Sequence, residues 1–64
     1  MKNTEFSLLK SRLTGMANRF EIIGIEEYIE GLNLSDIQHR TVERIKEEGK
    51  QMYKLYYGVE WKED

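Results

Sequence analysis

Apolar residues recur at alternating steps of three and four along most of this 64-residue chain. That spacing places side chains on one face of an α-helix, whereas a β-strand needs steps of two. One stripe fills the first half of the chain and another fills the second half, and no proline interrupts either of them. The stripes are Phe6, Leu9, Leu13, Met16, Phe20 and Ile23, then Val42, Ile45, Gly49, Met52, Tyr56 and Val59. The sequence therefore predicts an all-α fold.

Near the midpoint of the chain, signals for the end of a helix are followed at once by signals for the start of another. Gly31 suits the left-handed conformation that closes a helix. Asn33 is the predicted N-cap of the next helix, and Asp36 completes a capping box three residues later. We therefore expect helices over residues 4–31 and 34–57, followed by a short C-terminal tail.

The two stripes also predict how these helices pack. In an antiparallel hairpin, facing residues have a constant sum of sequence numbers, and the stripes satisfy this condition, with Leu13 facing Met52. The implied fold point lies beside Asn33, where the capping residues also place the turn. The predicted architecture is an antiparallel αα-hairpin that forms a single domain over residues 1–64.

A second apolar stripe in the first predicted helix does not fit a lone hairpin, because one hairpin cannot bury both stripes. Either the helix kinks at Gly24, or the second stripe packs against another subunit. A chain of about 60 residues hides only roughly 60% of its unfolded surface on folding, and this chain has no cysteine for a disulfide. We therefore expect a homodimer that forms a four-helix bundle. The predicted dimer interface comprises Ile22, Ile25, Ile29, Ile37 and Leu55.

Charge and hydropathy narrow the functional class. Ten basic and twelve acidic residues give a net charge of −2, whereas a dedicated nucleic-acid-binding protein is normally basic. No leader-like segment or run long enough to cross a membrane occurs, so we expect a cytoplasmic protein with no membrane partner. The abundance of Lys, Glu, Ile, Asn and Tyr is typical of AT-rich bacteria and their phages.

Acidic residues near the turn offer the best candidates for chemistry. Glu26, Glu27 and Glu30 end the first predicted helix, and His39 lies across the turn. Di-metal carboxylate sites in helical bundles use a Glu-x-x-His pair, which is absent, and His39 with Glu43 lacks a third ligand. No phosphate-binding loop or nucleophile motif occurs either. We expect no catalytic residue, no metal and no cofactor.

The segment Tyr28–Ile37, which contains a Glu-Gly-Leu-x-Leu sequence, resembles the elbow of a helix-turn-helix. That motif needs short helices and a separate recognition helix, whereas the second predicted helix continues to about Tyr57. The neighbouring glutamates would also repel phosphates.

One flank of the second predicted helix combines lysines with aromatic residues, which can hold a protein surface or stack on bases. Alternatively, the aromatic rings border the core while the lysine stems cover it. We predict a small non-catalytic protein-interaction module, an adaptor or inhibitor of a larger protein. The alternative is a small nucleic-acid-binding transcriptional regulator that uses the same flank. The predicted partner-binding residues are Lys46, Lys50, Lys54, Tyr57 and Trp61.

Overall fold

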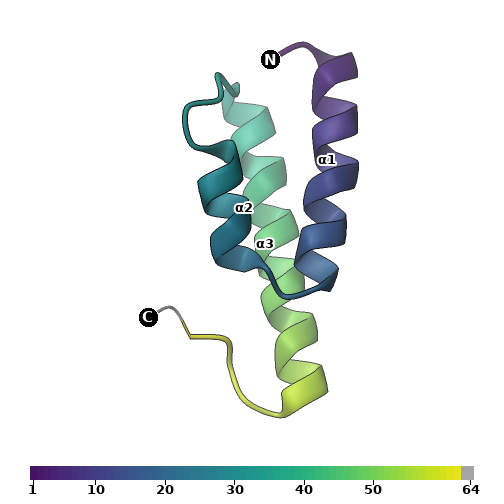
Figure 1. Ribbon diagram of the computed structural model, residues 1–64, viewed down its shortest axis with the longest axis vertical. Coiled ribbons are helices and arrows are strands. Elements are labelled where there is room, and N and C mark those ends of the chain that lie inside the picture. Colours follow the sequence, from purple (N-terminus) through teal and green to yellow (C-terminus); the bar gives the residue numbers. More distant parts are fainter. Residues whose placement is uncertain (63–64) are drawn as a thin grey trace.

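The computed structural model describes residues 1–62, and its helical content confirms the predicted all-α class (Figure 1). Helix α1 spans Asn3–Asn18, α2 spans Ile22–Ile29 and α3 spans Asp36–Tyr57. The predicted hairpin is wrong, because the first predicted helix is divided into α1 and α2. The predicted domain also includes residues 63–64, which lie outside the described residues.

Helices α1 and α3 run in the same direction, and α2 runs against both of them (Figure 1). At one end of the bundle, the Met1 ammonium group donates to the Asn33 carbonyl at 2.6 Å, and Gln38 Nε2 donates to the Met1 carbonyl at 2.6 Å. At the other end, the ring of Phe20 lies 5.3 Å from that of Tyr53. Facing residues of α1 and α3 therefore keep a roughly constant difference in number.

This parallel register replaces the predicted pairing of Leu13 with Met52. Leu13 is fully buried, whereas Met52 is exposed on α3. A constant sum of residue numbers requires the chain to reverse once between the two stripes. Here the chain reverses twice, so the rule does not apply.

The first reversal is a Schellman motif that ends α1. The Phe20 N–H donates to the Ala17 carbonyl at 3.0 Å, and the Glu21 N–H donates to the Met16 carbonyl at 2.9 Å. Phe20 occupies the position that is usually glycine, and its φ of 63° is left-handed. The break therefore lies at Phe20, whereas Gly24, where the sequence allowed a kink, lies within α2.

The second reversal follows α2 and combines a confirmed prediction with a corrected one. Gly31 has a φ of 84°, as predicted for a left-handed helix end. The N-cap of α3 is Ser35, and the prediction of Asn33 was wrong. The Gln38 N–H donates to Ser35 Oγ at 3.2 Å, and the Ser35 N–H donates to Gln38 Oε1 at 2.9 Å. This pair forms a complete capping box, because the Gln38 side chain reaches back to the N-cap backbone.

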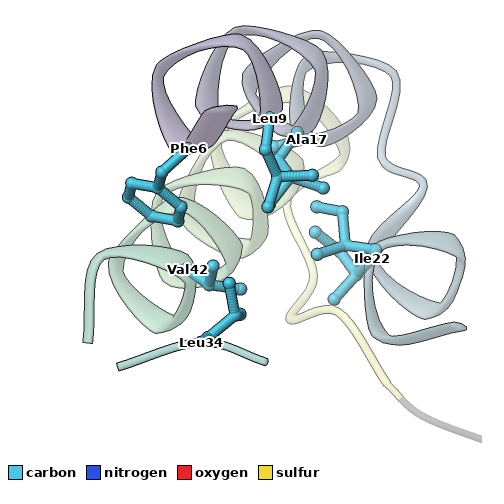
Figure 2. Packing of buried hydrophobic residues seen from close by; sticks show 8 residues of the cluster. Phe6, Leu9, Ala17, Ile22, Leu34 and Val42 are labelled. Carbon is cyan, nitrogen blue, oxygen red and sulfur yellow. The ribbon is translucent and has the colours of Figure 1, made fainter. Parts of the chain in front are cut away.

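The core lies where the three helices meet, and Figure 2 shows side chains from all three pointing into it. Ile22 and Ile25 are fully buried, together with Leu13 and Val42. The reversal at Phe20 turns the second apolar stripe toward α1 and α3 of the same chain. Burial of each such side chain contributes about 1.5–3 kcal/mol. Ile22 and Ile25 therefore need no second subunit to cover them.

Gly49 allows α3 to approach the other two helices closely. A Cβ atom at this position would lie 3.0 Å from Ala17 Cβ and 2.8 Å from Ile22 Cδ1. The Ala17 carbonyl oxygen would be 3.2 Å away. The end of the Ile22 side chain can move away. Ala17 Cβ and the Ala17 carbonyl can move only if helix α1 moves with them.

Two matched glycine-to-alanine substitutions test this packing. Gly49→Ala should lower the free energy of unfolding by about 1 kcal/mol or more, because overpacking exceeds the gain in helix propensity. Gly15→Ala should raise it by up to about 1 kcal/mol, because its added Cβ meets only the Arg19 guanidinium at 3.5 Å. Urea unfolding measures both changes. Stabilisation by Gly49→Ala as large as that by Gly15→Ala would contradict the close approach of α3.

Candidate functional site

The C-terminal part of α3 extends beyond the other two helices (Figure 1). Helices α1 and α3 start at the same end of the bundle, but α1 has 16 residues and α3 has 22. With a rise of 1.5 Å per residue, α3 is about 9 Å longer. The last turns of α3 therefore lack a neighbouring helix along much of their surface.

Large apolar side chains are concentrated on this part of the chain. Leu55 is 85% exposed and Tyr56 is 76% exposed. Of the nine large hydrophobic residues that are exposed within residues 1–62, five lie here. We call these five the overhang surface: Met52, Leu55, Tyr56, Tyr57 and Val59.

Aromatic contacts hold the tyrosines of the overhang surface in place. The ring centroid of Phe20 lies 5.6 Å from that of Tyr57 and 6.0 Å from that of Tyr56. The Tyr56 and Tyr57 ring centroids are 4.9 Å apart, and the ring planes meet at 67°. Tyr53 contacts Phe20 edge to face at 5.3 Å and Tyr57 at 4.6 Å. Such contacts contribute about 0.5–1.5 kcal/mol each beyond area burial, so they favour this arrangement of the rings.

The lysines of the predicted partner-binding flank all lie beside carboxylates. Lys50 Nζ lies 3.5 Å from Glu47 Oε1, and Lys54 Nζ lies 3.4 Å from Glu60 Oε1. Lys46 is buried, and its Nζ atom lies between Glu26 and Glu43. This flank therefore presents less positive charge than its sequence indicates.

Trp61, also predicted to bind a partner, folds back toward the bundle after α3 ends at left-handed Gly58. Its ring is half-buried and packs against the core, and the Lys50 ammonium lies 5.5 Å from the ring centroid. Tyr57 is exposed and belongs to the overhang surface. The structure thus brings Lys50, Lys54 and Trp61 together, but Trp61 also contributes to the fold.

The predicted dimer interface does not form one surface. Ile22 and Ile25 lie in the core of the chain, and Ile29 is half-buried against it. Ile37 and Leu55 are exposed, but 18 residues of α3, or about 27 Å, separate them. Sequence reasoning missed the overhang surface because it assigned Met52, Tyr56 and Val59 to a hairpin seam.

Within residues 1–62, no group of three or more His, Asp or Glu side chains is gathered as a metal site. The same residues include no helix that combines the length and apolar character needed to span a membrane. Comparisons with protein-family models, curated proteins and solved structures found no match to this chain.

Lys46 lies on the inner face of α3 with only 8% of its surface exposed. Its Nζ atom is 3.1 Å from Glu43 Oε1 and 3.3 Å from Glu26 Oε1. Burial by itself would lower the pKa of Lys46, but hydrogen bonds and charges from both glutamates outweigh burial and raise that pKa above its ordinary value. Folding therefore favours the protonated lysine.

Two substitutions compare the loss of the positive charge at Lys46 with the burial of a negative charge at the same position. Lys46→Met should reduce the free energy of unfolding by no more than about 1 kcal/mol, because both carboxylates stay hydrated. Lys46→Glu should reduce it by about 3–5 kcal/mol, because a third carboxylate would be buried without a partner. Equal tolerance of both changes would place Lys46 on the surface.

The raised pKa of Lys46 also fixes how the contribution of its ion pairs to stability changes with pH. The ion-pair contribution should be complete below the unfolded pKa of about 10.4 and lost as pH rises through the higher folded value. The difference in unfolding free energy between wild type and Lys46→Met should therefore be constant near neutral pH and change in alkali as the lysine loses its proton.

Proposed function

We propose that this chain is a small non-catalytic protein-interaction module that docks on a larger protein through the overhang surface. The observation that carries the proposal is the concentration of exposed apolar and aromatic side chains on the part of α3 that extends beyond the other helices and at Val59 just after it. Exposed apolar surface of this kind is typical of sites where a partner binds. Such a module would act as an adaptor or as an inhibitor.

The size and chemistry of the overhang surface support this proposal. A tyrosine side chain can bury about 150–250 Å², and Tyr56 and Tyr57 are joined by three apolar residues. These side chains could form the centre of a standard interface, to which each partner contributes roughly 800 Å². Tyrosine is also enriched among residues that dominate binding energy. Since both rings already contact Phe20, less side-chain entropy would be lost on binding than for rings without such contacts.

Nucleic-acid binding through the lysine flank has less support. Lys46, Lys50 and Lys54 each have a carboxylate oxygen within 3.5 Å, so phosphates would compete with glutamates for them. The residues of the overhang surface are apolar or aromatic, and the exposed charges of Lys54 and Glu60 beside them are paired with each other. Strong retention on DNA that falls steeply with added salt would favour the nucleic-acid alternative.

The predicted homodimer takes a different form in this proposal. Ile22 and Ile25 pack within their own chain, so the surface available to a second copy is the one around Leu55. Two copies joined there would not form the four-helix bundle expected from two hairpins. Sedimentation shows directly whether the partner is a second copy.

A pair of charge substitutions on α3 tests the proposed docking surface. Leu55→Glu should weaken partner binding at least about 30-fold, the effect of losing a binding hot spot of about 2 kcal/mol. Gln51→Glu makes a similar charge change one turn earlier on the exposed side of α3 and should leave binding unchanged. Tagged wild type and both variants would be used to capture partners from the source cells, with mass spectrometry and then titration of the purified partner.

Both variants should unfold within about 0.5 kcal/mol of wild type, because both residues are exposed. Equal capture by wild type and Leu55→Glu would contradict docking through the overhang surface.

A further inference from the structure

A hollow of about 440 Å³ lies between the end of α1, the start of α2 and the C-terminal tail. Its apolar lining comes from Met16, Phe20, Ile23 and Trp61. Side chains of Glu21 and Glu27 add carboxylates to the same lining. This volume falls in the range of small ligand pockets, and the lining combines a few charged groups with apolar walls.

Two carboxylates line the hollow, those of Glu21 and Glu27, and they differ in their partners. Glu21 pairs with Arg19 at 3.0 Å, whereas the exposed Glu27 has no ion pair within residues 1–62. Lys62 also lines the hollow, and the described residues form no ion pair with it. The carboxylate of Glu27 is therefore available to a cation from outside the chain.

Trp61 already binds one cation within the protein. The Lys50 ammonium lies 5.5 Å from its ring centroid, a distance typical of a cation–π contact. Lys50 and Trp61 together line a separate, smaller hollow that also includes Glu47 and Glu60. The Trp61 ring thus stands between two hollows, only one of which contains Lys50.

We propose that the larger hollow receives an arginine side chain from the protein partner. The stem of the arginine would pack on Met16 and Ile23, and its guanidinium would lie between the Trp61 ring and the carboxylate of Glu27. A guanidinium stacks on aromatic rings and forms paired hydrogen bonds with a carboxylate, so arginine fits this lining better than lysine. This inference rests on the proposed function, since it specifies the chemistry of a protein partner at a second surface.

Trp61 is the only tryptophan in the chain, so its fluorescence and its indole N–H resonance both report on the hollow. The probe is acetyl-Ala-Arg-Ala-amide, and the control is the same peptide with uncharged, nearly isosteric citrulline. The arginine peptide should change both Trp61 signals with saturation, and the citrulline peptide should bind at least about tenfold more weakly, consistent with a charged hydrogen bond.

Three variants locate the binding. Glu27→Gln should weaken the arginine peptide about tenfold, because it removes the unpaired carboxylate. Glu30→Gln is the matched control, since it makes the same change in the segment that follows α2 but does not line the hollow. Its affinity should equal that of wild type. Lys62→Gln should strengthen binding, because it removes a competing cation.

The proposal would be overturned by absence of saturable binding, by equal binding of both peptides, or by equal weakening from Glu27→Gln and Glu30→Gln. The last result would indicate a general attraction to an acidic surface. If the arginine peptide fails while Leu55→Glu still abolishes partner capture, the hollow is wrong and the proposed function stands. If the peptide binds but Leu55→Glu has no effect, the proposed docking surface is wrong.

Discussion

The backbone of Phe20 adopts a left-handed conformation that costs a residue with a Cβ about 1–2 kcal/mol. Two Schellman hydrogen bonds and the contacts of its ring with three tyrosines offset this cost. Because the chain reverses here, α2 runs back along α1 and carries Ile22 and Ile25 into the core. The second reversal near Gly31 then sets α3 parallel to α1.

Both candidate surfaces follow from this arrangement. In a hairpin, the first helix would have covered Met52 and Tyr56, but the parallel register leaves them exposed on the longer helix. The same reversal places Phe20 and the start of α2 beside Trp61, which creates the acidic, partly aromatic hollow. The overhang surface is apolar, whereas the hollow places the Glu27 carboxylate beside an aromatic ring, so the two surfaces would recognise different features of a partner.

The sequence predicted the helices and one of the two reversals, but it did not predict the reversal at Phe20. The apolar spacing predicted helices, and Gly31 marked the end of one of them. The break at Phe20 was missed because phenylalanine carries no local signal for a left-handed helix end. The first apolar stripe also continues through the break with unchanged spacing. The residue numbers therefore satisfied the constant sum of a hairpin although the chain does not form one. The ion pair of Lys46 with Glu43 could be predicted from the sequence, because the two residues are three positions apart on one helix face.

The sign of one stability difference tests the reversal at Phe20 most directly. Phe20→Ala and Phe20→Gly both remove the ring, so comparing them isolates the backbone. At a left-handed position glycine avoids the Cβ penalty, and Phe20→Gly should be more stable than Phe20→Ala by about 1 kcal/mol. In a continuous helix through residue 20, alanine would instead be more stable by about 1 kcal/mol. Urea unfolding of the two variants measures this difference, and the second result would contradict the three-helix account.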